Sequence, residues 1–187
     1  MPLDTDVMQE LDTLVRGGFE DRDRIVEILT EEMFEPGELD ADEVEAAVDA
    51  ALDAHEHSKA GWPAMTDCDR LDSVFDALEA RGLVALQFAG FTQSDGFSDV
   101  SEVYAGLPDK GRVIGYCFYH GQDLARAVNG AGLHLAFGPV DPALEETEGS
   151  KVGVVIVEEL HRAGFRVEWD GTFKQRIFVP DIDWQRR

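Results

Sequence analysis

The sequence predicts a mixed α/β fold, with an α+β arrangement as the alternative. Three observations carry this prediction. Apolar residues recur at helical spacing over residues 1–60, short apolar runs alternate with helical segments over residues 61–187, and Asp170-Gly171 is typical of a hairpin turn. With 187 residues, of which 44% are hydrophobic, the chain can bury a substantial core. We therefore expect N-terminal helices packed on a five-stranded mixed sheet that closes with a C-terminal antiparallel hairpin.

Residues 1–60 are expected to form an acidic helical segment. Helices are predicted from residue 4 or 5 to 17, from 20 to 34, and from 41 onwards. A capping box at Asp40 and Glu43 marks the start of the third helix. The apolar stripe of this helix would be exposed to water in isolation, so we expect the segment to pack on the rest of the chain. The stripe consists of Val44, Ala47, Val48, Ala51 and Leu52.

Residues 61–187 are expected to form an α/β domain, in one compact unit with the helical segment. Helices are predicted over residues 67–81, 98–107, 122–129 and 150–163. Strands are predicted over residues 83–88, 112–119, 133–137, 165–169 and 175–179. Because strands and helices alternate, we expect mainly parallel crossovers. Asp170-Gly171 is predicted to be a two-residue turn with Gly171 at positive φ.

The charge of the chain restricts its partners. Acidic residues number 39 against 16 Lys and Arg, which gives a formal net charge of −23. Such a chain repels phosphate backbones and anionic membranes, so direct binding to nucleic acid or to a membrane is not expected. Its acidic face can bind a basic protein partner or mimic nucleic acid, or it is only a solvated surface. No apolar run is long enough to span a membrane, and no signal peptide is recognisable, so a cytoplasmic location is expected.

Polar residues gather where three of the predicted strands end. Ligands in alternating α/β sheets lie beyond the carboxyl ends of strands, so these exits are candidates for a pocket with one imidazole, several carboxylates and aromatic walls. The candidate ligand-binding residues are Thr92, Asp95, His120, Gly121, Gln122, Asp123, Trp169 and Asp170.

His120 is the most informative single residue, because it precedes a predicted helix. The helix dipole would keep its imidazole neutral, which suits a base or a ligand. The alternative is a histidine that caps the helix, with Asp123 as an ordinary first-turn acid. If the protein binds a small molecule, we expect a carboxylate, phosphate or sulfate near His120, Gly121 and Gln122, held by free helix N–H groups.

Other catalytic and metal-binding patterns are weak. His55 and His57 point in different directions on a helix, so no metal site is assigned. Cys68 and Cys117 lie outside any Cys-x-x-Cys motif and are expected to be free thiols. No nucleophile elbow or glycine-rich phosphate loop is present in the sequence, so neither catalytic residues nor cofactors are assigned.

Five segments of the chain resemble an uncharacterised bacterial family that is defined only as a domain of unknown function. They are Met65-Thr-Asp-Cys-Asp-Arg-Leu, Gly115-Tyr-Cys-Phe-Tyr-His-Gly-Gln-Asp, Leu133-His-Leu-Ala-Phe-Gly, Val167-Glu-Trp-Asp-Gly-Thr and Asp183-Trp-Gln-Arg. The resemblance implies no activity. Some relatives carry a cysteine cluster where this chain reads Phe91-Thr-Gln-Ser-Asp-Gly, without cysteine. A weaker likeness, confined to residues 167–171 and to the acidity of the chain, is to the protein inhibitor of ribonuclease E, and it implies a protein-binding role.

Three functions are compatible with these features. The leading expectation is a non-enzymatic protein-binding or regulatory module, because no catalytic constellation is recognisable and the helical segment is acidic. The second is an enzyme or small-ligand binder with a pocket around His120. The third is an immunity protein or a mimic of nucleic acid. The sequence leaves the partner and the oligomeric state open.

Overall fold

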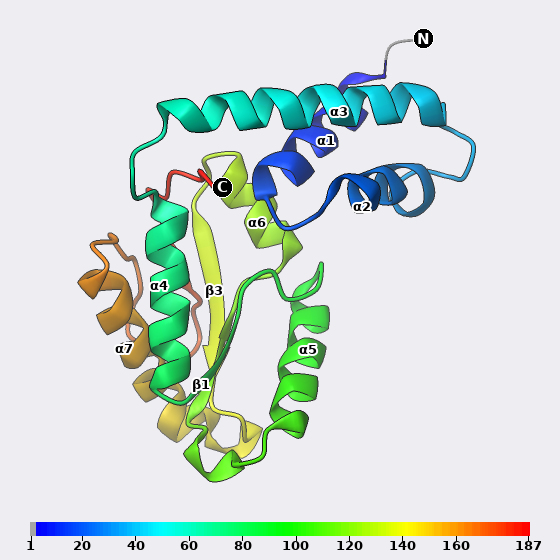
Figure 1. The fold of residues 1–187 in the computed structure, drawn as a ribbon. Helices are drawn as coiled ribbons and strands as arrows, with labels where there is room; N and C mark the ends of the chain where they lie inside the picture. Colours follow the sequence, from blue (N-terminus) through cyan, green and yellow to red (C-terminus); the bar gives the residue numbers. More distant parts are fainter. Residues whose placement is uncertain (1–2) are drawn as a thin grey trace. The chain divides into compact units, whose positions relative to one another are not determined.

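The computed structural model describes residues 3–187 and divides into two compact units. The first unit contains the chain up to Thr66 together with Trp184–Arg187, and the second contains Asp67–Asp183. Figure 1 shows their helices and strands. The predicted mixed α/β class is confirmed, because helices alternate with the strands of a four-stranded mixed sheet.

The first unit is helical. It contains α1 (Thr5–Gly17), α2 (Arg22–Glu27) with its π-helical continuation η1 (Ile28–Glu32), α3 (Ala41–Ser58) and the 3-10 turn η2 (Lys59–Gly61). Each α-helix begins after an aspartate whose carboxylate accepts a backbone N–H, which satisfies one of the free donors of the first turn. The capping residues are Asp4, Asp21 and Asp40. The buried core consists of Leu11, Val15, Ile25, Leu29, Val44 and Val48.

The last four residues of the chain belong to this helical unit, which the sequence analysis did not anticipate. The indole Nε1 of Trp184 donates to the carbonyl oxygen of Gly17 at 3.4 Å. His55 Nε2 lies 3.1 Å from the carbonyl oxygen of Arg186, and the Arg186 guanidinium lies 4.1 Å from the centroid of the Phe19 ring. The tail therefore adds a buried tryptophan and polar contacts to α1 and α3.

The sheet of the second unit has four strands rather than the expected five. In the order in which they pair, they are β1 (Leu83–Leu86), β2 (Gly115–Phe118), β3 (Leu133–Gly138) and β4 (Ile177–Val179). The segment 165–169 contributes only an isolated bridge between Glu168 and Phe178. Its aromatic residues contact helices instead of pairing in the sheet. The guanidinium of Arg70 in α4 lies 4.9 Å from the centroid of the Phe165 ring, and the Trp169 ring lies against Gly153 of α7.

The strand directions also differ from the prediction. Only β1 and β2 are parallel, whereas β2 pairs with β3 and β3 pairs with β4 in antiparallel fashion. The expectation of mainly parallel crossovers is therefore wrong. An apolar run in the sequence indicates that a strand is buried, but it does not indicate the direction of the strand. Here α6 (Gly121–Val128) connects β2 to β3, which is antiparallel to it.

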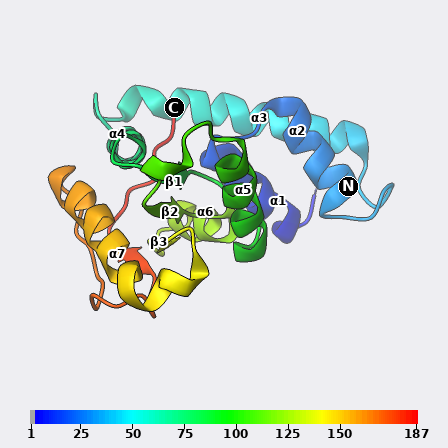
Figure 2. The same cartoon turned by 90° about the horizontal axis from the view of Figure 1, so that it is seen from below.

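The two sides of the sheet are covered by different helices. Figure 2 shows α4 (Asp67–Ala80) and α7 (Glu145–Arg162) on one side and α5 (Gln93–Gly106) on the other. The short 3-10 turns η3 (Lys110–Arg112) and η4 (Pro142–Leu144) precede β2 and α7. The α4 and α7 side is apolar, with buried side chains from Leu71, Val74, Phe75, Leu78, Val152, Ile156 and Leu160.

The chain reverses near its C-terminal end, but not by a two-residue turn. Gly171 has the predicted positive φ, at +81°. The antiparallel partners closest to the reversal are Glu168 and Phe178, so a longer loop joins them. The carboxylate of Asp170 accepts the backbone N–H of Thr172 at 2.8 Å, and Trp169 Nε1 donates to the Thr172 carbonyl at 2.9 Å. These local bonds hold a side-chain-stabilised turn in place of the predicted hairpin turn.

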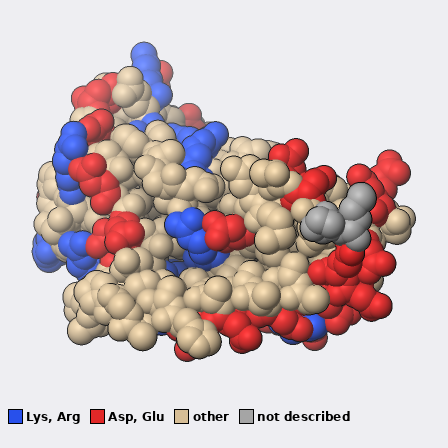
Figure 3. Space-filling model, turned by 90° about the horizontal axis from the view of Figure 1, so that it is seen from above, with Lys and Arg blue, Asp and Glu red and all other residues tan. Residues whose placement is uncertain are grey.

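Acidic side chains outnumber basic ones on the face shown in Figure 3. The exposed acids between α2 and the first turn of α3 are Glu31, Glu32, Glu35, Glu38, Asp40 and Asp42. Within residues 3–187, none of the helices has both the length and the apolar character that crossing a membrane requires.

Candidate functional site

His120 follows β2 and Tyr119 and is the N-cap residue of α6, the position that the sequence predicted. Its side chain makes no capping hydrogen bond, so the expected bond of a capping histidine to its own backbone is not formed. Instead, the residue is buried, with 3% of its surface exposed. The imidazole therefore takes its partners from other side chains.

Asp123 is the centre of this group of side chains. Its carboxylate is completely buried and lies 3.0 Å from His120 Nε2. Nη1 of Arg126 lies 3.1 Å from Asp123 Oδ1, and Nη1 of Arg176 lies 2.9 Å from Oδ2 and 3.1 Å from Oδ1. Arg176, in the segment before β4, thus reaches a carboxylate 53 residues earlier. We call Asp123, His120, Arg126 and Arg176 the Asp123 cluster.

The electrostatic environment keeps the imidazoles near the Asp123 cluster neutral. Burial is the main cause that lowers the pKa of His120; the Asp123 carboxylate opposes it, and the charges of Arg176 and Arg126 lower the pKa further. Burial likewise lowers the pKa of His134 in β3, with the same two arginines adding to the effect. A neutral His120 donates from Nε2 to Asp123, because a carboxylate only accepts, and Nδ1 then carries a lone pair.

The N-terminus of α6 does not offer the free donors that the sequence analysis assumed. The N–H of Gly121 donates to the carbonyl of Gly90 at 2.9 Å, and the N–H of Gln122 donates to the carbonyl of Phe91 at 3.2 Å. Both amides are therefore occupied by the loop that follows β1. An anion held by these amides, as proposed from the sequence, would have to displace that loop.

This loop has an unusual backbone conformation. Phe88 has φ = +53°, and it is the only residue other than glycine with positive φ within residues 3–187. Gly90, two residues later, has φ = +57°. A bulky residue in this region is strained, and such strain persists only where surrounding contacts enforce it. The backbone bonds from Gly121 and Gln122 supply such contacts.

Thr92 and Asp95 have a local structural role. They form a complete capping box at the start of α5, in which each side chain accepts the other residue's backbone N–H. These bonds from Thr92 lower the pKa of Asp95, with a smaller effect from His120. The sequence analysis expected this helix to begin at Ser98, but it begins at Gln93. The reason is the capping box of Thr92 and Asp95, which satisfies free backbone groups of the first turn.

Trp169 and Asp170 are not brought together with the Asp123 cluster. The Trp169 ring packs edge-on against Phe137, with centroids 5.7 Å apart, and contacts Gly153 of α7. Alternate side chains of a strand point to opposite faces, so Phe137 and His134 of β3 lie on opposite faces of the sheet. The predicted pocket of three converging strand exits therefore reduces to two, after β1 and after β2.

The two cysteines are buried thiols. Neither Cys68 nor Cys117 is in a disulfide bond, and burial raises the pKa of the Cys117 thiol well above its ordinary range. Over the described residues 3–187, no group of three or more His, Cys, Asp or Glu is arranged to hold a metal ion.

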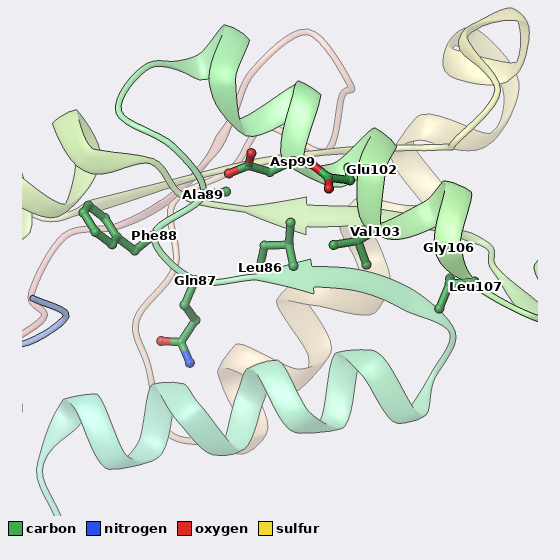
Figure 4. Close-up of a pocket in the computed structure, with 9 residues that line it drawn as sticks. All are labelled: Leu86, Gln87, Phe88, Ala89, Asp99, Glu102, Val103, Gly106 and Leu107. Carbon is green, nitrogen blue, oxygen red and sulfur yellow. The ribbon is translucent and has the colours of Figure 1, made fainter.

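A groove that the sequence analysis missed lies between α5 and the end of β1. It has a volume of about 580 Å³ and is open to solvent, and Figure 4 shows the residues that line it. They are Leu86, Gln87, Phe88, Ala89, Asp99, Glu102, Val103, Gly106 and Leu107. We call this the α5–β1 groove. Its helix side follows the spacing i, i+3, i+4, i+7 from Asp99, which was visible in the sequence but resembles an ordinary solvated face.

Comparison with known proteins identifies a family without a known activity. No curated protein and no solved structure shows significant similarity to the chain. One family, described as a domain of unknown function (DUF6891), matches residues 3–187. The match covers both units and confirms the resemblance seen in the sequence. The chain belongs to the DUF6891 family.

Proposed function

We propose that this chain is a non-enzymatic protein-binding module whose α5–β1 groove takes a partner segment that carries basic and apolar residues. The observation that carries the proposal is the composition of the groove, which combines apolar side chains with two carboxylates. Within the described part of the chain, no cation pairs with Asp99 or Glu102. A Lys or Arg of a partner would supply the missing charge.

The exposure of α5, the helix beside the groove, supports this assignment. Of the 14 residues of α5, only Gly96 and Val100 are buried. Val103, inside the groove, is 42% exposed. An exposed apolar side chain beside unpaired charges is typical of recognition surfaces, which combine an apolar centre with a polar rim.

As part of the same proposal, we infer that the interaction takes place in the cytoplasm. Neither cysteine forms a disulfide bond, which is the usual state of thiols in a reducing compartment. An enzymatic role has less support, because Nδ1 of His120, the nitrogen that could act as a base, is buried. A general base must reach the proton that it removes.

The proposal is tested by selecting displayed random peptides of about twelve residues on the immobilised full-length chain. We expect enrichment of peptides in which Lys or Arg flanks an apolar residue. Affinity for these peptides should fall at least tenfold in the double variant Asp99→Asn/Glu102→Gln.

The matched control is Asp76→Asn/Glu79→Gln, which removes the same charge from an exposed i, i+3 pair on α4. This control should change affinity less than twofold. Equal losses in the two double variants, or no enrichment of basic peptides, would reject the α5–β1 groove as the binding surface.

A further inference from the structure

The Asp123 cluster is unusual in this chain because arginines outnumber carboxylates in it. Several other arginines contact more than one carboxylate: Arg22 contacts three, and Arg24, Arg81 and Arg166 contact two each. The buried Glu159 is, like Asp123, shared by two arginines, but one of them, Arg81, has Glu158 as a second acid. In the cluster, Arg126 and Arg176 share the single carboxylate of Asp123. With both nearby imidazoles neutral, the cluster has a formal charge of +1 inside a chain of net charge −23.

Most of the hydrogen-bonding capacity of these two arginines is unused. Each guanidinium reaches Asp123 through Nη1 alone. Within residues 3–187, neither Nε nor Nη2 of Arg126 or Arg176 has an acceptor. The side chains are 50% and 30% exposed, so these donors are accessible to solvent. Both Nη1 atoms lie 3.1 Å from the same oxygen, Asp123 Oδ1, so the two guanidinium groups are neighbours.

Two buried nitrogens lie near the cluster. Nδ1 of His120 and Nδ1 of His134 are the buried side-chain polar atoms without a hydrogen-bond partner in the described part of the chain. Both imidazoles lie close enough to Arg126 and Arg176 to be affected by their charge. Nδ1 of His120 carries a lone pair, because Nε2 donates to Asp123, so it does not bind an anion, whereas a neutral His134 that carries its proton on Nδ1 has an unused donor.

We propose that Arg126 and Arg176 bind a small oxyanion, either a phosphate group or a carboxylate. Asp123 and His120 hold the two guanidinium groups side by side through their Nη1 atoms. The Nε and Nη2 atoms of each guanidinium are the two donors that would bind the anion. Planar guanidinium forks match two oxygens of one phosphate or carboxylate, which a point charge does not. This site is independent of the α5–β1 groove. The two guanidinium groups, and not the occupied backbone amides of α6, would donate the hydrogen bonds to the anion.

The test is isothermal titration of the full-length chain with inorganic phosphate, and separately with acetate, at constant ionic strength held with chloride. Saturable binding of phosphate but not acetate identifies a phosphate site, and the reverse identifies a carboxylate site. Binding should weaken at least tenfold in Arg126→Gln and only a few-fold in Arg126→Lys, which keeps the charge but loses the fork.

Arg112→Gln is the matched control, because Arg112 is 86% exposed and pairs with one acid, Asp109, in the same unit. It should change the affinity less than twofold. Arg126 is half exposed, so its replacement leaves the buried contact of Asp123 with Arg176 in place, and circular dichroism checks the fold. The proposal is overturned if neither anion saturates, or if Arg126→Gln and Arg112→Gln weaken binding equally.

Discussion

The two sides of the sheet in the second unit differ in how many apolar side chains their helices bury and in where charged side chains are buried. On one side, α4 and α7 bury Leu71, Phe75, Ile156 and other apolar side chains almost completely. On the other, α5 buries only two small or medium residues, and α6 brings the charged Asp123 cluster. The α4 and α7 side contributes strongly to the stability of the fold, since burying a large aliphatic side chain contributes about 1.5–3 kcal/mol, and the α5 side adds a second buried cluster that includes Val100, Tyr116 and Phe118.

This difference between the two sides of the sheet underlies both proposals. A helix that only closed a core would bury a continuous apolar stripe, as α7 does. α5 instead leaves Val103 and, among the described residues, two unpaired acids beside a groove, and Asp123 of α6 is contacted by His120, Arg126 and, from the segment before β4, Arg176. Both proposed sites therefore lie away from the α4 and α7 side of the sheet.

The largest expected effect concerns the buried charge. Asp123→Ala leaves Arg126, Arg176 and His120 without their common partner, and we expect a loss of about 3–5 kcal/mol in the free energy of unfolding. Asp76→Ala, at an exposed acid on α4, should change it by less than about 0.5 kcal/mol. Urea unfolding measures both. A loss below about 1 kcal/mol in Asp123→Ala would mean that the cluster is not a structural anchor.

The next effect tests the apolar side directly. Leu160→Ala in α7 removes a completely buried side chain and should cost about 2–5 kcal/mol. Val103→Ala in the α5–β1 groove should cost no more than about 0.5 kcal/mol, because this side chain is 42% exposed. Similar losses in the two variants, measured by urea unfolding, would remove the contrast between the two sides.

A smaller effect is expected where α5 meets the sheet. Gly96 lies against the ring of Phe118, and a Cβ atom at this position would clash with that ring. Gly96→Ala should therefore cost about 1–3 kcal/mol. Gly106→Ala, with no atom near the new methyl group, should instead stabilise the helix by up to about 1 kcal/mol. If both variants gained stability, α5 would not be seated on the sheet through Gly96.

How much of this architecture could be predicted depended on the range of the interactions. The helix starts at Asp4 and Asp40 and the positive φ of Gly171 are local, and the sequence predicted each of them correctly. The direction of β3 and the place of Trp184 depend on tertiary contacts, which an apolar pattern does not encode.

The candidate sites show the same limit. His120 and Asp123 were found because they lie three residues apart at one helix start. Arg176 was missed because 53 residues separate it from Asp123. The α5–β1 groove was missed because the helix residues that line it, although they lie within the predicted helix 98–107, have the pattern of an ordinary solvated face, and their place beside the end of β1 depends on tertiary contacts.

The smallest effect concerns pH. The pKa values of His120 and His134 are lowered in the folded state, so the unfolded chain binds protons more readily than the folded chain as pH falls below about 6.5. Stability should therefore be full above pH 7 and decline towards pH 5.5. His134→Gln should make this decline shallower in urea titrations at the two pH values. An unchanged slope would show that the imidazole of His134 is as easily protonated in the folded chain as in the unfolded one.

The central claim, that the thinly covered side of the sheet binds a basic partner, is tested most directly by nuclear magnetic resonance. The ¹⁵N-labelled full-length chain is titrated with the peptide acetyl-Lys-Leu-Val-Lys-Leu-amide and with its Glu-for-Lys analogue. We expect saturable amide shifts over residues 86–89 and 99–107 with the Lys peptide, and none with the Glu peptide. Shifts confined to the acidic surface over residues 31–43, or equal shifts with both peptides, would contradict the claim.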